Sequence, residues 1–362
     1  MNRRPAGALA GIAIVFLLTA LGGAAAGRPI PAGVLEVPRP VAPTHDVVRG
    51  APGAVAARIS ATASSQRYLV GDGSEATIEV SVTAACADLC TAAEPQRIAS
   101  FVGTLPHGFE VDLLEVQLDT PFQLELDCGY GAEACYYSGE DRIVLSGDEE
   151  VDRDGATRDF VLAHEYGHHV AQHRELPSPF ASAIDWGTER WASVEGVCQG
   201  RRLGKLFPGD EGDHYYEDPG EAFAETFAHL RFPEMPVRWR YLGALRPTAA
   251  SLRAVEEDTL LPWRGRTGLV LSGRVPARGE GAAVESIPTP LDGTVTLRPI
   301  GLHRRGYELA LRSRAGRLLH DFRLRATAAQ TDFTVCGQSR LRLELRSRSA
   351  RPTPYKLQIQ RP

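Results

Sequence analysis

Residues 164–168 have the sequence His-Glu-Tyr-Gly-His, an H-E-x-x-H motif, and no other feature constrains the chain as strongly. In an α-helix, residues four apart lie on one face, about 6 Å apart along the axis, so His164 and His168 can point at the same spot. Apolar residues surround the motif at helical spacing, and Asp159 is a candidate N-cap. The apolar positions of this predicted helix are Phe160, Val161, Leu162, Ala163, Val170 and Ala171.

Two histidines so placed suit a zinc ion. Imidazole nitrogen is a common Zn²⁺ ligand, and Glu165, directly after the first histidine, can act as general base toward a water on the metal. The alternative is an ordinary amphipathic helix whose histidines are solvated. A catalytic zinc site usually takes three protein ligands and keeps one position open, so the zinc interpretation requires a third ligand elsewhere in the chain.

The third ligand is not expected on the same helix. One class of zinc sites continues the motif as HExxHxxGxxH, which places a Gly and a third His further along the chain. Here the corresponding residues are Ala171 and Arg174, and neither fits that pattern. This class is therefore excluded, and the third ligand must come from a separate segment.

Residues 218–228 are predicted to form a second helix that can supply this ligand. Asp218 is a suitable N-cap and Pro219 suits the first helical position. Glu221 and Glu225 are four residues apart and share one face. We expect Glu221 to bind the zinc ion and Glu225 to accept the free N–H of a ligand histidine, which fixes its tautomer. Alternatively, Glu221 belongs to a capping box with Asp218.

With these residues, the chain resembles the gluzincin zinc metallopeptidases, in which a HExxH helix is followed by a helix with an ExxxE or ExxxD motif. It also resembles secreted actinobacterial peptidases that carry HEYGHH and PGEAFAE motifs. The resemblance covers about residues 58–232 and is specific at the two helices. The matching residues are His164, Glu165, His168, Glu221 and Glu225.

The resemblance implies a hydrolase that cleaves peptide bonds of a peptide or protein substrate with Zn²⁺ as cofactor. It also implies a Tyr or His that stabilises the oxyanion of the transition state. His214, Tyr215 and Tyr216 lie just before the second helix and are the candidates. We expect Tyr215 to take this role on the resemblance, and a packed aromatic loop is the alternative for each of the three.

The first 26 residues are typical of a secretory signal peptide. Arg3 and Arg4 form a basic start, residues 9–21 are apolar, and the alanines at 24–26 form an A-x-A cleavage site. The protein is therefore expected to be secreted, and a membrane anchor formed by residues 6–26 is the alternative. Residues 27–57 are rich in Pro, Ala and Gly, which predicts a linker or pro-segment.

Export permits disulfide bonds, and the chain has six cysteines. Six cysteines allow fifteen pairings, so the sequence does not give the connectivity. Pairs 86/90 and 128/135 are close enough in sequence to form short loops, which would leave the last two to join distant segments. No C-x-x-C pair exists to suggest a cysteine zinc site. The six candidates are Cys86, Cys90, Cys128, Cys135, Cys198 and Cys336.

The periodicity predicts an α+β fold with two domains. Residues 58–265 are expected to form the zinc metallopeptidase domain, with a small sheet beside the HExxH helix and the Glu-bearing helix. Residues 266–362 alternate apolar and polar residues without a helical segment, which predicts an all-β, sandwich-like domain. The first domain is expected to have a helix at 92–105 and strands within 58–83 and at 111–118, 122–126 and 142–145. The second is expected to have strands at 294–297, 307–311, 321–324, 341–345 and 355–359.

The overall charge of −5 conceals a strong asymmetry. Residues 266–362 contain 18 Lys and Arg against 7 Asp and Glu, which leaves 22 against 38 for residues 1–265. A basic β-domain can bind an anionic cell-wall polymer or a lipid surface. It can also dock on the acidic first domain of its own chain, or simply have solvated arginines. A nucleic-acid partner is not expected, because the chain is exported and has no stacking motif.

Two other functions remain open at the level of sequence. One is a zinc amidase that acts on cell-wall cross-links. The other is a non-catalytic surface-binding protein with a vestigial zinc site. Glu165 argues against the second, because a structural site needs no base.

Overall fold

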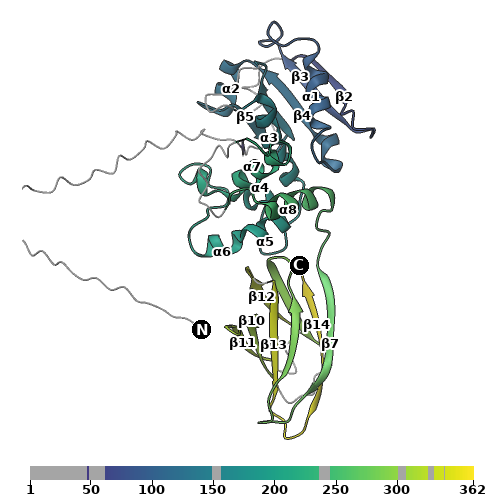
Figure 1. Cartoon of the computed structure of the whole chain (residues 1–362), viewed down its shortest axis with the longest axis vertical. Helices are drawn as coiled ribbons and strands as arrows, with labels where there is room; N and C mark the ends of the chain where they lie inside the picture. Colours follow the sequence, from purple (N-terminus) through teal and green to yellow (C-terminus); the bar gives the residue numbers. More distant parts are fainter. Residues whose placement is uncertain are drawn as a thin grey trace, which may run out of the picture. The chain divides into compact units, whose positions relative to one another are not determined.

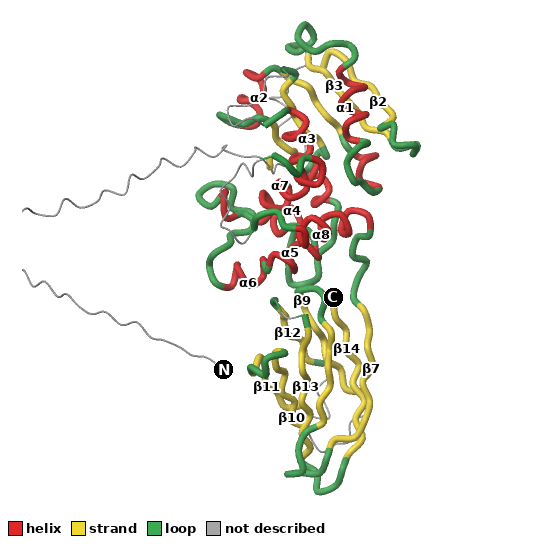
Figure 2. The backbone as a smooth tube through the Cα atoms, in the orientation of Figure 1, coloured by secondary structure: helices red, strands yellow, loops and turns green. Residues whose placement is uncertain are grey.

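The secondary structure changes character along the chain, from mixed helices and strands to strands alone among the described residues after residue 260 (Figures 1 and 2). The computed structural model describes residues 47–48, 62–148, 156–235, 245–300, 307–324, 330–337 and 339–362. The fold is α+β, as the periodicity predicts. The predicted signal peptide lies outside the described residues. In the predicted linker, Val47 and Val48 form a short strand.

The first region contains a six-stranded mixed sheet in the order β1-β5-β6-β4-β3-β2. Neighbouring strands are parallel in the pairs β1–β5, β3–β4 and β4–β6, and antiparallel in β2–β3 and β5–β6. The strands are β1 (Val47–Val48), β2 (Thr62–Leu69), β3 (Thr77–Thr83), β4 (Glu115–Asp119), β5 (Ala134–Tyr137) and β6 (Arg142–Ser146).

Helices connect and follow these strands. The α-helices are α1 (Glu94–Val102), α2 (Pro121–Cys128), α3 (Arg158–Gln172), α4 (Ala183–Trp186), α5 (Glu189–Glu195), α6 (Val197–Arg202), α7 (Pro219–Arg231) and α8 (Ala249–Leu260). Two short 3₁₀ helices are η1 (Phe109–Leu113) and η2 (Tyr215–Glu217). Helix α3 carries the H-E-x-x-H motif and α7 carries the two glutamates.

Three local predictions for the first region are wrong. Residues 122–126 lie in helix α2 rather than a strand, because Thr120 caps the helix by accepting from the Gln123 N–H and Pro121 occupies the first turn. The first part of the expected strand 111–118 belongs to η1, and only β4 is extended. The N-cap of α3 is Thr157, which accepts from the Phe160 N–H, and Asp159 lies inside the first turn.

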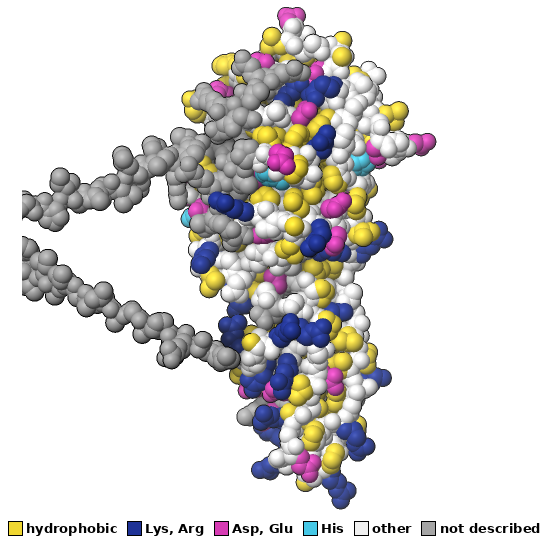
Figure 3. All heavy atoms as spheres, in the orientation of Figure 1, with side chains coloured by type: hydrophobic (Ala, Val, Ile, Leu, Met, Phe, Trp, Pro, Cys, Tyr) yellow, Lys and Arg dark blue, Asp and Glu magenta, His cyan; other side chains and the backbone are white. Residues whose placement is uncertain are grey.

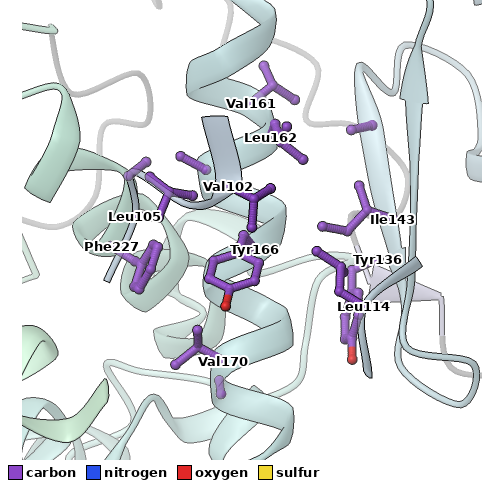
Figure 4. Close-up of a cluster of buried hydrophobic side chains, with 14 of the residues drawn as sticks. Val102, Leu105, Leu114, Tyr136, Ile143, Val161, Leu162, Tyr166, Val170 and Phe227 are labelled. Atoms are coloured by element: carbon purple, nitrogen blue, oxygen red, sulfur yellow. The ribbon is translucent and has the colours of Figure 1, made fainter. Parts of the chain in front are cut away.

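Helix α3 is buried along nearly its whole length. Its side chains Val161, Leu162 and Tyr166 lie between sheet residues such as Ile143 on one side and Phe227 of α7 on the other (Figure 4). A helix that is packed on two sides has little freedom to rotate. This packing therefore fixes the direction in which the motif residues point.

The C-terminal strands form two four-stranded antiparallel sheets, in the orders β11-β10-β13-β8 and β12-β9-β14-β7. The inward residues of both sheets share one hydrophobic cluster, as in a β-sandwich. The five predicted strands are all present, and β7, β8 and β12 were not predicted. The strands are β7 (Thr267–Val275), β8 (Ala283–Pro288), β9 (Gly293–Pro299), β10 (Tyr307–Ser313), β11 (Leu318–Leu324), β12 (Thr331–Val335), β13 (Arg340–Ser347) and β14 (Thr353–Arg361).

All six cysteines form disulfide bonds, in the pairs Cys86–Cys90, Cys128–Cys135 and Cys198–Cys336. The first two close short loops. The third joins α6 to the segment after β12, across 138 residues of sequence.

In the part of the chain that the structure describes, no helix has both the length and the apolar character needed to cross a bilayer.

Candidate metal centre

Helix α3 presents His164 and His168 on the face that meets α7. The two rings are edge to face, with centroids 5.0 Å apart, as expected for residues one helical turn apart. His164 is 5% exposed and His168 is fully buried. Histidines this deeply buried are not the solvated side chains of an ordinary amphipathic helix.

Two glycines allow α7 to pack closely against its neighbours, Gly167 against α3 and Gly220 against α4. A Cβ on Gly167 would lie 2.9 Å from the Cα of Ala224 in α7, which is closer than real Cβ contacts. A Cβ on Gly220 would lie against the carbonyl oxygen of Ile184 in α4. Gly167, at the second variable position of H-E-x-x-H, therefore sets the separation of α3 and α7.

Helix α7 begins as the sequence predicts. Asp218 is the N-cap and accepts from the Gly220 N–H, and Pro219 occupies the first turn. Glu221 and Glu225 both point toward α3 and are almost completely buried. The Glu221 carboxylate lies beside the histidines, which is the ligand geometry rather than that of a capping box.

The three donor atoms are spaced as zinc ligands. Glu221 Oε2 lies 3.4 Å from His164 Nε2 and 3.5 Å from His168 Nε2. Ligand atoms that are bound tetrahedrally to one Zn²⁺ at about 2.1 Å lie about 3.4 Å apart. His164, His168 and Glu221 form a group able to hold a metal ion, with donor atoms within 4.8 Å of one another. The donor set of two imidazoles and one carboxylate fits zinc.

Glu225 supports this group from one turn further along α7. Its Oε2 lies 3.6 Å from His164 Nδ1, the ring nitrogen opposite the donor atom. Its Oε1 lies 3.3 Å from His229 Nε2, and His229 is also buried. His229 is not among the residues predicted from the sequence, although its spacing of four residues from Glu225 on α7 is a signal that could have identified it.

The charges in the cluster favour a cation. Burial acts to lower the pKa of His164, but hydrogen bonds to Glu221 and Glu225 raise this pKa well above its usual value. Burial acts to raise the pKa of Glu221, but the charge of His168 and hydrogen bonds from both histidines hold it well below its usual range. A metal ion would take the place of the proton on His164, so binding would release a proton.

Glu165 and Tyr215 are both almost completely buried. Glu165 is 2% exposed, and its negative charge contributes to the raised pKa of His164. Tyr215 is 1% exposed and its ring is edge-on to Tyr216, with centroids 5.6 Å apart. His214 stacks on Phe207 and its Nδ1 lies 2.7 Å from Asp210. The oxyanion role of Tyr215 stays a prediction.

No known family model matches the chain, and no curated protein matches its sequence. Among solved structures, the chain is similar to the Yersinia pseudotuberculosis-derived mitogen, with 11% identity over 26% of this chain and 86% of that one and a TM-score of 0.20. It is also similar to Legionella pneumophila aminopeptidase A, with 14% identity over 80% of this chain and 36% of that one and a TM-score of 0.23. At such low TM-scores these likenesses carry no argument about activity.

Proposed function

We propose that the protein is a secreted zinc-dependent peptidase of the gluzincin type. The observation that carries this proposal is the position of the Glu221 carboxylate, 3.4 and 3.5 Å from the donor nitrogens of His164 and His168. Three ligands from protein leave one position open, which is the arrangement of a catalytic rather than a structural zinc ion. Glu165 supplies the base that a structural site does not need.

His164, His168 and Glu221 would hold the ion. When bound, Zn²⁺ would supply a Lewis acid that polarises a scissile carbonyl and makes water more acidic. Glu165 accepts a proton from the attacking water and passes it to the leaving amine, so that the water oxygen adds to the carbonyl carbon and the C–N bond breaks. Glu225 holds the His164 ring in the orientation that directs Nε2 to the metal.

Tyr215 is our candidate for the hydrogen-bond donor that stabilises the oxyanion. It is held by η2, the 3₁₀ helix that leads directly into α7, so its position is tied to that of Glu221. A donor placed in advance of the reaction costs little reorganisation in the transition state. We therefore expect Tyr215→Phe to lower kcat while the zinc content of the protein changes little.

The test of this function is the variant Glu165→Gln. It removes the base but no metal ligand, so zinc content and fold are retained while kcat/KM on casein peptides falls about 10³-fold or more. The matched control is Glu175→Gln, which alters an exposed glutamate just beyond the same helix. Hydrolysis by Glu165→Gln at the wild-type rate would contradict the mechanism.

Casein and purified peptidoglycan are offered to the wild-type protein in parallel. Cleavage of casein supports the peptidase. Cleavage of peptidoglycan alone would instead identify an amidase of cell-wall cross-links, with the same zinc ligands and base.

A further inference from the structure

Helix α3 has a second histidine-bearing face that the proposed peptidase chemistry does not use. His169 and His173 are four residues apart near the C-terminal end of the helix. They face Asp141, which lies in the turn between β5 and β6. One carboxylate and two imidazoles from segments about thirty residues apart in sequence therefore meet at one place.

The donor atoms of this second cluster are close enough to bind one ion. Asp141 Oδ1 lies 2.8 Å from His173 Nε2 and 3.8 Å from His169 Nδ1. The three residues form a group whose ligand atoms lie within 4.8 Å of one another. The His169 side chain is fully buried, whereas those of Asp141 and His173 are 30% and 17% exposed. An ion could thus enter from solvent on one side.

The tautomer of His169 is fixed in the way that a metal site requires. Its Nε2 lies 2.8 Å from the backbone carbonyl oxygen of Glu110, and a carbonyl can only accept, so Nε2 carries the hydrogen and donates it. In the neutral ring, Nδ1 therefore presents its lone pair toward Asp141. A donor hydrogen bond from the far ring nitrogen to a backbone carbonyl is typical of metal-binding histidines.

The carboxylate is also held in place. The Tyr136 hydroxyl lies 2.9 Å from Asp141 Oδ1 and 3.1 Å from His169 Nδ1. Asp141 itself lies in a turn with a φ of 54°, in the left-handed region that non-glycine residues adopt uncommonly. This uncommon backbone conformation therefore occurs at Asp141, the residue whose side chain completes the cluster.

We propose that Asp141, His169 and His173 form a second metal site, which binds a divalent transition-metal ion such as Zn²⁺. Two imidazoles with one carboxylate favour zinc and its neighbours over Ca²⁺ and Mg²⁺, which prefer oxygen ligands. The ion would join the end of α3 to the β5–β6 turn. Because none of these residues belongs to the first centre, this site stands or falls independently of the proposed peptidase function.

The rival explanation is a hydrogen-bond network that needs no ion, and Asp141→Asn separates the two. The Asn side-chain oxygen still accepts from Tyr136 and His173, but it is a much weaker metal ligand than a carboxylate. If the cluster is a metal site, Asp141→Asn should bind zinc there at least about tenfold more weakly than wild type. The melting temperature of the metal-free variant should equal that of the metal-free wild type. A lowered metal-free melting temperature with unaltered zinc binding would support the network alone.

The zinc is counted on the full chain by equilibrium dialysis and elemental analysis. Wild type should bind two equivalents, His173→Gln one, and His168→Ala one. On the His168→Ala background, adding His173→Gln should remove the remaining equivalent. Adding His107→Gln instead should not, because that histidine pairs with Asp72 at 3.1 Å outside the cluster.

Two outcomes overturn the second site. In the first, the wild-type protein binds only one equivalent of zinc and His173→Gln still binds it. In the second, the double variant His168→Ala, His173→Gln still binds zinc. If His168→Ala does not fold, the comparison of wild type with His173→Gln by native mass spectrometry decides between two equivalents and one. Whether the first centre binds zinc is judged separately, from whether the His173→Gln variant still binds one equivalent.

Discussion

Gly167 sets how closely α7 approaches the histidines, and two opposing effects decide what an alanine would do there. Alanine is favoured over glycine in a helix by about 1 kcal/mol. However, its Cβ would lie 2.9 Å from the backbone of Ala224, and such overpacking costs about 1–3 kcal/mol. The second effect is the larger, and it acts directly on the spacing between the histidines and Glu221.

We therefore predict that Gly167→Ala lowers the melting temperature and weakens zinc binding about tenfold or more, because small displacements of ligands are costly. Competition with a chelator and thermal unfolding measure the two effects. The control is Gly212→Ala, at an exposed position where a Cβ would have ordinary contacts only. A Gly167→Ala protein that is more stable than wild type, with unchanged zinc affinity, would show that helix propensity dominates and that close packing is not needed.

At the scale of elements, α5 and α8 are joined through a buried carboxylate pair. Asp258 of α8 accepts from the Thr188 hydroxyl and from the Arg190 N–H at the start of α5, and Glu189 accepts from the Trp263 N–H. Burial, and then the charge of Asp258, raises the pKa of Glu189 to about 8. The folded protein thus holds a proton on Glu189 that the unfolded chain releases near its ordinary pKa.

This difference predicts a loss of stability as pH rises. Between about pH 4.5 and 8 the folded state binds more protons at Glu189 than the unfolded state, so the free energy of unfolding falls with pH, by at most about 1.4 kcal/mol per unit for one group. Glu189→Gln should flatten this part of the pH profile in urea unfolding. Arg190 Nη1 lies 2.9 Å from Glu189 Oε1, and its Nε lies 3.7 Å from Glu257 Oε2. Glu257→Gln is therefore the matched control, because Glu257 faces the same arginine but is 61% exposed. Equal pH profiles for wild type and Glu189→Gln would refute the assignment.

The elements of the candidate centre could be predicted because their signals are local. Asp218 and Pro219 define the start of α7, and the spacing of Glu221 and Glu225 places both on one face. The sequence predicts a strand in place of helix α2 because the five-residue alternation at 122–126 fits a strand as well as a short helix. The signal for the helix is the cap at Thr120. Strands of two to four residues, such as β1 and β5, have too little periodicity to be recognised at all.

The contacts that assemble the centre depend on packing rather than on local pattern. That α7 lies against α3 rests on Gly167 and Ala224, which are 57 residues apart and have no spacing relation to each other. The place of Asp141 beside His169 and His173 follows from the register of the β5–β6 hairpin. Such juxtapositions appear only when the tertiary structure is known.

At the scale of the whole molecule, the basic surface of residues 266–362 is the main feature outside the candidate metal centre. Lys and Arg side chains gather over these strands on the face drawn in Figure 3. On β13, Arg342 and Arg346 alternate with buried leucines, and their side chains are 51% and 63% exposed. Glu344 lies between them on β13, within 4.0 Å of both. This sheet face is our candidate for binding anionic cell-wall polymer or lipid.

We predict that Arg342→Glu with Arg346→Glu lowers binding of the full chain to anionic vesicles and cell walls, and that wild-type binding weakens as salt rises. Exposed charges are screened within about 8 Å at physiological ionic strength. Sedimentation with vesicles measures the bound fraction. The control is Arg274→Glu with Arg298→Glu, which makes the same charge change on exposed arginines of the other sheet. Equal loss in both pairs would mean that net charge, and not this face, determines binding.

Anomalous X-ray diffraction at the zinc edge shows whether His164, His168 and Glu221 together hold a zinc ion beside Glu165. Crystals of the zinc-loaded protein should show an anomalous peak about 2.0–2.2 Å from His164 Nε2, His168 Nε2 and a Glu221 oxygen, with Glu225 in contact only with histidine rings. A peak coordinated by Glu225 in place of Glu221, or no peak between α3 and α7, would contradict the account.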